Sequence, residues 1–313
     1  MRPDDIKYIT DFCAEYEYPD GACEALLAAY DAVCKNAEAK IIFFAQREGY
    51  ETLGPDGFDF DKMKSDVDLL EERVGVSKFT LQLLNYILLT PHMKTLYEQR
   101  GIDLEIYRDS VLDLKWKLFE CIRMHGIFGT FVAQWHKHFF KMAMFALGRL
   151  QFHVTDFGRD ATVGGITLTP ETKVINTHIP ACGPLTEELC IDAYSRAEKF
   201  FDGLFPKDSP TIIKCDSWLL FPEHKMILPE TSGIRRFAEQ FSLVHARYAA
   251  PMFRPWPIFY DKQNAPAYEL PESTSLERIY KERYLKGLPS GSGVGVILFK
   301  DGKILNNDKD KMV

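Results

Sequence analysis

The sequence predicts an α+β protein, with a helical N-terminal domain over residues 1–147 followed by a mixed α/β sheet domain over residues 148–313. In the first part, apolar residues recur every three or four positions, which is the period of an amphipathic helix. After Gly148 the pattern changes, and Leu150, Phe152 and Val154 alternate as in a half-buried strand. Residues 173–221 then read as strand, tight turn, helix and strand, which is most simply a right-handed crossover between two parallel strands.

The first domain is expected to consist of several helices, at residues 22–48, 60–73, 77–100 and 104–124. Gly49 should end the first of these, and Ser77 should cap the third. Pro91 should kink or interrupt that third helix, because proline lacks the backbone N–H that a helix interior requires.

Residues 130–147 carry a stripe of aromatic side chains, and such a stripe is typical of a hydrophobic core. His136 and His138 lie two residues apart, so on a helix they point in different directions and cannot hold one metal ion together. No metal site is therefore expected.

The second domain is expected to contain antiparallel strands as well as the crossover. Strands at 150–154 and 166–168 should form an antiparallel pair that turns at Gly164 and Gly165. The remaining elements are a helix at 231–241, a weak edge strand or loop at 255–261, a helix at 276–286, a linker at 291–295, and a hairpin at 294–305 that turns at Asp301 and Gly302.

The turn inside the crossover, built from Ala181 to Pro184, is a candidate anion site. Thr186 is suited to cap the following helix, whose unpaired N–H groups and partial positive charge favour phosphate. Against this, Glu187 and Glu188 lie in the first helical turn and oppose a bound anion. A turn that only reverses the chain therefore stays open as an alternative.

Composition limits the class of protein. The 38 basic and 45 acidic residues give a net charge of 38 − 45 = −7, so we expect no nucleic-acid partner. Seven cysteines without C-x-x-C spacing fit a reducing compartment. The first segment, MRPDDIKYITDF, lacks the apolar core of a signal peptide, and no apolar run approaches about 18 residues. We therefore expect a cytoplasmic protein with no membrane partner, and the oligomeric state stays open.

Several segments together resemble bacterial GNAT-like acyltransferases, in which a helical N-acyltransferase N-terminal domain precedes a GNAT-like C-terminal domain. These segments are LGRLQF (147–152), THIPACGPLTEE (177–188), CDSWLLFP (215–222), TSGIRRF (231–237) and STSLERIYKERYLKG (273–287), with RGIDLEIYRDSVLDLKWKL (100–118) and MHGIFGTFVAQWH (124–136) in the helical half. The resemblance implies that acyl-CoA binds where two neighbouring parallel strands part, with its pyrophosphate on the turn after the first strand.

By this resemblance, the residues that bind acyl-CoA are Ile179, Pro180, Ala181, Cys182, Gly183, Pro184, Leu185 and Thr186. The sequence departs from the family's usual pyrophosphate signature, an Arg or Gln followed by Gly-x-Gly/Ala. ACGPLT stands in its place and supplies fewer glycines.

Acyl transfer from a thioester to an amine needs a base for the amine, a donor for the carbonyl oxygen and an acid for the thiolate. His178 ends the central strand and is our candidate base, although a histidine that only forms a strand-end hydrogen bond is the alternative. Cys215 and Ser217 alternate onto one face of the next strand as candidate donor, acid or, for Cys215, acylated nucleophile. For Cys215 the alternative is a small buried apolar residue.

Arg149 and Arg235 are further candidates for contacts with anionic parts of a ligand, with solvated surface arginines as the alternative.

The function predicted is transfer of an acyl group from acyl-CoA to a small-molecule or peptide acceptor, with an amine as the reacting group. A non-catalytic GNAT-like protein that binds acyl-CoA or another small ligand is the alternative, and a purely structural scaffold is a third. Binding of CoA separates the scaffold from the other two, and turnover separates the enzyme from the binding protein.

Overall fold

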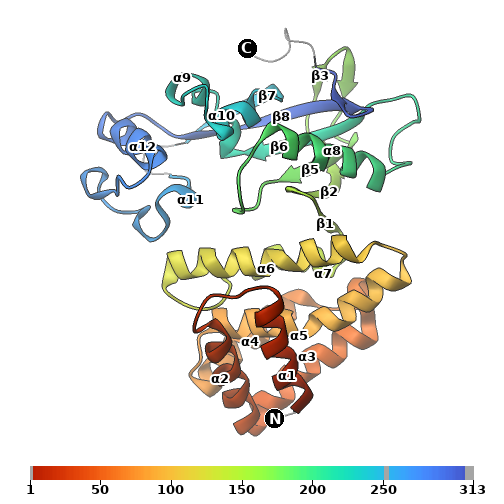
Figure 1. Cartoon of the computed structure of the whole chain (residues 1–313), viewed down its shortest axis with the longest axis vertical. Coiled ribbons are helices and arrows are strands. Elements are labelled where there is room, and N and C mark those ends of the chain that lie inside the picture. Colours follow the sequence, from red (N-terminus) through yellow and green to blue (C-terminus); the bar gives the residue numbers. More distant parts are fainter. Residues whose placement is uncertain (1–2, 250–253, 307–313) are drawn as a thin grey trace. The chain divides into compact units, whose positions relative to one another are not determined.

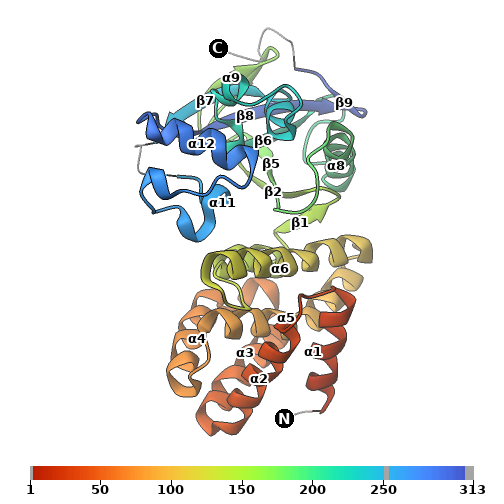
Figure 2. The same ribbon diagram turned by 60° about the vertical axis from the view of Figure 1, so that its left-hand side comes forward.

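The computed structural model describes residues 3–249 and 254–306, and it divides into two compact units, Met1–Phe145 and Ala146–Val313. Figures 1 and 2 show helices throughout the first unit and a mixed sheet with helices in the second. The predicted α+β class, helices followed by a mixed sheet domain, is confirmed. In the described part of the chain, no helix is both long enough and apolar enough to cross a membrane.

Helix α5 is the centre of the first unit. The helices of this unit are α1 (Pro3–Glu15), α2 (Ala22–Lys35), α3 (Ala37–Gly57), α4 (Phe60–Val74), α5 (Lys78–Gln99), α6 (Leu104–His125) and α7 (Ala133–Phe140). All six others contact α5. Residues Thr80 to Thr90 of α5 are buried without interruption, as expected for a helix that is surrounded by other helices.

Ser77 caps α5 as predicted, but the expected interruption at Pro91 is wrong. A proline leaves the carbonyl four residues earlier without its helical partner. Here that carbonyl belongs to Ile87, and the Thr90 hydroxyl donates to it over 2.5 Å. Because the freed acceptor is satisfied locally, α5 continues through Pro91.

The single helix predicted over 22–48 is also wrong, since the chain forms two helices that meet at Asn36. The Asn36 side chain accepts from the backbone N–H groups of Glu38 and Ala39 and so starts α3. Gly49 lies inside α3 rather than at its end. A Cβ there would come 3.3 Å from the Phe58 ring, so this glycine serves close packing.

The second unit contains a mixed sheet with the strand order β1-β2-β5-β6-β8-β7, and β9 pairs with β8. The strands are β1 (Met144–Leu147), β2 (Leu150–Asp156), β3 (Ala161–Val163), β4 (Ile166–Leu168), β5 (Lys173–His178), β6 (Thr211–Ser217), β7 (Ser242–Tyr248), β8 (Gly291–Lys300) and β9 (Lys303–Ile304). The helices are α8 (Glu187–Phe200), α9 (His224–Ile227), α10 (Gly233–Ala238), α11 (Trp256–Phe259) and α12 (Ser275–Leu285), with 3-10 turns η1 (Trp218–Leu220), η2 (Tyr260–Lys262) and η3 (Ala267–Glu269).

The predicted crossover is confirmed, because β5 and β6 pair in parallel on either side of α8. The predicted hairpin at Asp301 and Gly302 is confirmed by the pairing of β8 with β9, and both turn residues have positive φ. The predicted helix at 276–286 is α12, which begins with a capping box between Thr274 and Glu277.

The antiparallel pair expected from strands 150–154 and 166–168 is wrong. β2 pairs with β5, whereas β4 pairs with β3 in a separate hairpin. This hairpin packs Val163 and Leu168 against Val174, Ile212 and their neighbours on one face of the main sheet. It is therefore a cover on the sheet and not an extension of it.

The linker predicted at 291–295 is wrong too, since these residues begin β8, the long strand beside β6 in Figure 1. Their glycines allow close packing. A Cβ on Gly293 would lie 2.3 Å from the Leu220 carbonyl oxygen, and one on Gly295 would lie 2.7 Å from the Phe241 side chain. Glycine in a strand often marks such an approach.

Residues 255–261, expected as an edge strand or loop, form α11 and the start of η2 instead. Pro255 precedes the helix as its N-cap, and proline is compatible with a helix start. The last strand of the segment 173–221 is β6, which ends at Ser217, where η1 begins. Helix α1 and strands β1 and β7 have no counterpart in the prediction.

Candidate active site

The parallel strands β5 and β6 part from each other at their carboxyl ends. Their direct pairing covers Ile175 with Ile213 and Asn176 with Lys214. Beyond that point β5 remains paired with β2 as far as His178, and β6 remains paired with β8 as far as Ser217. Each strand therefore follows its outer neighbour, and a gap opens between the two.

A buried hydroxyl stands beside this gap. Thr177 is 1% exposed, and its Oγ1 has no hydrogen-bond partner in the described part of the chain. A buried polar group without a partner costs free energy, and a ligand that supplies a partner recovers it. A polar ligand group that reached the Thr177 hydroxyl from the gap would supply this missing partner.

The turn that follows β5 is held from outside by Arg149. Its guanidinium donates to the carbonyl oxygens of Pro180 (3.1 Å), Gly183 (3.4 Å) and Pro184 (2.8 Å). Arg149, a candidate for ligand contact in the sequence, is therefore engaged with the backbone of the turn. Gly183 has φ +50° and open space around the position of a Cβ.

Helix α8 begins at the end of this turn with the predicted cap. The Thr186 hydroxyl accepts from the N–H of Leu189 over 3.4 Å. The Glu188 carboxylate bonds its own backbone N–H and the Thr186 hydroxyl, and these two bonds lower its pKa. A carboxylate thus occupies part of the position that a phosphate would take at this helix N-terminus.

The start of α10 lies against the same turn. A Cβ on Gly233 would come 3.0 Å from the Leu185 carbonyl oxygen. Arg236 of α10 also contributes to the low pKa of Glu188. The turn is therefore bordered by α10 and by Arg149 of the β1–β2 connection.

Three polar side chains meet on one face of the sheet beside the gap. His153 of β2 lies directly opposite Asn176 of β5, and His178 is two residues further along β5, so all three point to the same side. The Nε2 atom of His178 lies 2.9 Å from Nδ1 of His153 and 2.9 Å from Nδ2 of Asn176. The two imidazole rings are nearly parallel, at 11°, with centroids 4.9 Å apart.

Two family models match the chain. The N-acyltransferase N-terminal domain matches residues 7–142, and the GNAT-like C-terminal domain matches residues 144–297. The chain belongs to the GNAT-like N-acyltransferase family. This membership confirms the resemblance seen in the sequence and, with it, the prediction of a GNAT-like acyltransferase.

Solved structures share the fold of this GNAT-like N-acyltransferase. One is an acyltransferase mutant in complex with octanoyl-CoA, with 20% sequence identity and a TM-score of 0.68 over 94% of this chain and 88% of that chain. Another is an acyltransferase in complex with decanoyl-CoA and teicoplanin, with 20% identity and a TM-score of 0.67 over 93% and 87% of the two chains. Among curated proteins, no sequence matches.

Cys215 of this N-acyltransferase lies on the opposite side of the sheet from His178. It alternates with Lys214, the direct partner of Asn176, and it is fully buried. Burial raises the pKa of its thiol far above the ordinary value. A nucleophilic cysteine needs an accessible thiolate, so this environment suits a small packed side chain.

Ser217 is half-buried at the end of β6, and its Oγ accepts from the N–H of Leu219 over 3.2 Å. The hydroxyl therefore caps η1 while its own hydrogen remains available for donation. Asp216, which lies between Cys215 and Ser217 in the sequence, points to the other side of the sheet and pairs with Arg247.

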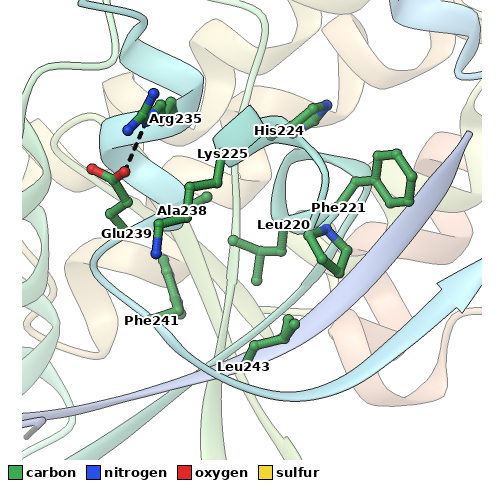
Figure 3. A pocket seen from close by; sticks show the side chains of 10 residues that line it. Leu220, Phe221, His224, Lys225, Arg235, Ala238, Glu239, Phe241 and Leu243 are labelled. Carbon is green, nitrogen blue, oxygen red and sulfur yellow. Dashed lines mark hydrogen bonds and ion pairs between the residues drawn. The ribbon is translucent and has the colours of Figure 1, made fainter. Parts of the chain in front are cut away.

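Arg235 lies in a different hollow of the second unit, shown in Figure 3. The hollow is lined by Leu220, Phe221, Pro222, His224, Lys225, Arg235, Ala238, Glu239, Phe241 and Leu243. The Arg235 guanidinium is held 2.9 Å from Glu239 and donates to the Leu228 carbonyl oxygen over 3.2 Å. It has partners within the fold, and nothing in these contacts directs it to a ligand.

His153 and Asn176 are not among the site residues predicted from the sequence. Alternation along LQFHVTD and KVINTHI places them on defined strand faces, and that signal was present. What was lacking was the pairing of β2 with β5, because the strand at 150–154 was assigned to the wrong partner. The register brings His153 opposite Asn176 only after that pairing is known.

Proposed function

We propose that this protein transfers an acyl group from acyl-CoA to an amine acceptor, with the thioester in the gap between β5 and β6. The observation that carries the proposal is the parting of these strands next to His178 and directly before the glycine-containing turn. The family supports acyl transfer, and structures with the same fold hold octanoyl-CoA and decanoyl-CoA.

In this proposal the residues Ile179 to Thr186 bind the cofactor moiety of acyl-CoA. The pyrophosphate lies on Ala181–Leu185, where backbone N–H groups and the α8 N-terminus favour an anion. The pantetheine arm runs into the gap, and the Thr177 hydroxyl gives one of its polar groups a partner. Glu188 has to turn away, or lose its contact with its own N–H, when the phosphates arrive.

His178 is the base that we assign to the acceptor amine. The amine nitrogen attacks the thioester carbonyl carbon, a C–N bond forms and the C–S bond breaks. One proton of the amine passes to the His178 imidazole, and the sulfur leaves as a thiolate that must gain a proton. We assign to the Ser217 hydroxyl, which lies at the end of the other strand that borders the gap, a hydrogen bond to the departing sulfur. The proton held by the His178 imidazolium then passes through solvent to the thiolate, which restores the base.

Binding is tested first, by the shift in melting temperature with CoA, octanoyl-CoA and decanoyl-CoA. A ligand at about a hundred times its Kd should add roughly 2.7 kcal/mol of stability. Gly183→Asp places a negative charge on the turn and should abolish the shift. Gly203→Asp is the matched control, because Gly203 also has positive φ and open space but lies beyond the end of α8.

Turnover is tested by release of free CoA thiol from octanoyl-CoA in the presence of primary amines. His178→Ala should lower kcat by about 100-fold or more without a comparable change in the Kd for acyl-CoA. Binding without thiol release for any amine would favour the non-catalytic alternative. The absence of a shift with every thioester would overturn the acyl-CoA assignment.

A further inference from the structure

Lys214 stands on the His178 face of the sheet, half-buried and one strand away from the proposed base. It is the direct partner of Asn176 across the β5–β6 pair. Its ammonium donates to the carbonyl oxygen of Phe157 over 3.0 Å. Asp216, the acid two residues further along β6, is paired with Arg247. The ammonium of Lys214 is thus bonded to a carbonyl oxygen, while the Asp216 carboxylate, already paired with Arg247, acts on it only through its charge.

A second cation lies close by. Arg159 is in the connection from β2 to the β3–β4 hairpin. Burial has the largest effect on the pKa of Lys214 and lowers it, Asp216 raises it, and the charge of Arg159 lowers it further. The Nε atom of Arg159 is buried and makes no hydrogen bond with any described residue. Lys214 and Arg159 repel each other, and partial burial removes water that would weaken this repulsion, so the two charges oppose folding. An anion bound beside them would attract both charges.

The surroundings define where such an anion would sit. The β3–β4 hairpin covers the apolar part of this face, including Ile212, while Asp216 is exposed. Lys214 lies between these two residues, at the edge of the covered part. From the strand spacing and the rise of two residues, the Cα atoms of Lys214 and His178 are roughly 8 Å apart.

We propose that Lys214 and Arg159 bind an anionic group of the acceptor, on the same sheet face as His178. The acceptor is then an amine that carries a carboxylate or similar anion several bonds away from its nitrogen. This inference rests on the proposed function, since it names the class of acceptor that the acyltransferase uses.

The test compares ω-amino acids with their uncharged ω-amino amides as acceptors for octanoyl-CoA. 4-Aminobutyrate, 6-aminohexanoate and 8-aminooctanoate vary the distance between amine and carboxylate. For the length that spans the two subsites, the acid should exceed the amide in kcat/KM by roughly tenfold, mainly through KM. Lys214→Met and Arg159→Gln should each reduce this preference, and Lys214→Arg should retain most of it.

Lys173→Gln is the control, because Lys173 is a cation on the same sheet that already has a carboxylate partner, Asp156. It should leave the preference for the acid unchanged. Melting temperatures of all variants show whether each one folds. Equal use of acid and amide at every length by the wild type would overturn the inference while leaving the acyltransferase function intact.

A direct binding measurement separates the two proposals further. Calorimetric titration with the N-octanoyl derivatives of 6-aminohexanoate and of its amide needs no turnover. Tighter binding of the acid, lost in Lys214→Met, would support the anion site even if no thiol release were seen. Equal affinity of the two products would count against it, whatever the result with acyl-CoA.

Discussion

The imidazole of His153 lies 2.9 Å from that of His178, measured from Nδ1 of the first to Nε2 of the second, and the two rings are nearly parallel. Two ring nitrogens at this distance share one hydrogen. For His178 to act as the base, its Nε2 carries this hydrogen and the Asn176 amide presents its oxygen to the same N–H. The pair can then hold one extra proton on an outer nitrogen, whereas a second would force two N–H groups into the same space. We infer that the two histidines act as one unit, with His178 as the base and His153 as its positioning residue.

Replacement of His153 should therefore reduce turnover without weakening the binding of acyl-CoA. For His153→Phe we expect kcat to fall by about 10- to 100-fold, because His178 loses the bond that orients it. His153→Gln can still form one hydrogen bond and should retain more activity. The measurement is kcat from thiol release together with the Kd of acyl-CoA from calorimetry.

A double-mutant cycle separates this role from a structural one. In the His178→Ala background, His153→Phe should cause little further loss, because the group that it orients is gone. Fully multiplicative losses, or a parallel rise in the Kd of acyl-CoA, would argue that His153 acts independently of His178.

Glu188→Gln should strengthen CoA binding. The Glu188 carboxylate bonds the N–H and hydroxyl groups at the start of α8, where the proposed pyrophosphate needs them. Removal of its charge should lower the Kd for CoA by roughly fivefold, the scale of a helix-terminus charge interaction. Titrations at two salt concentrations measure it, since the gain should shrink as salt screens the charges.

Glu187→Gln is the matched control for Glu188. It removes one negative charge from the same exposed helical turn, but we find no bond from Glu187 to the α8 start in the described chain. Its effect on the Kd should be smaller. Unchanged or weaker CoA binding by the Glu188 variant would mean that the phosphates do not lie on this turn.

The sequence predictions that succeeded depend on contacts between residues that are close in the sequence. Ser77, Thr186 and Thr274 cap helices because their side chains meet backbone N–H groups within a few residues, and such information lies in the immediate sequence. The crossover at 173–221 was predictable for the same reason. In contrast, Pro91 and Gly49 depend on contacts with Thr90 and with Phe58, which periodicity alone does not show.

The candidate site divides in the same way. His178 and the turn at Ala181–Pro184 follow from one continuous segment and could be proposed from sequence. His153 and Lys214 join them only through strand register, which a single sequence does not specify.

Gly293→Ala should severely destabilise the second unit, because the glycines of β8 are required by close packing and not by flexibility. The added methyl would lie 2.3 Å from the Leu220 carbonyl oxygen and 2.6 Å from the Leu243 side chain. Since this clash involves backbone, we expect a loss of about 3 kcal/mol in the free energy of unfolding. Denaturation with guanidinium measures the loss.

Ser292→Ala is the neighbouring control and should change the stability only slightly, because it removes a hydrogen bond with the exposed Arg247. If the two variants were equally stable, the packing of η1 on β8 would have to differ from that seen here.

Acid should destabilise the second unit through His224, which is buried and hydrogen-bonded at both ring nitrogens. Its Nδ1 lies 3.0 Å from the Leu219 carbonyl oxygen and so carries the hydrogen, and its Nε2 accepts from the Tyr280 hydroxyl over 2.6 Å. This pattern requires a neutral ring, and burial lowers the pKa of His224 from 6.5 to about 4. Between these two values the unfolded chain binds a proton that the folded chain does not.

Stability therefore falls as the pH decreases from 6.5 to 4, by about 1.4 kcal/mol per pH unit for this one histidine. In His224→Leu the free energy of unfolding should no longer show this slope with pH. The variant should also be less stable at pH 7, because the Leu219 carbonyl and the Tyr280 hydroxyl lose their partner.

His245→Gln is the control, because His245 is exposed to solvent in the folded state and should leave the slope unchanged. Urea denaturation at half-unit pH steps measures it, and an identical slope in wild type and His224→Leu would show that His224 is not held neutral in the fold.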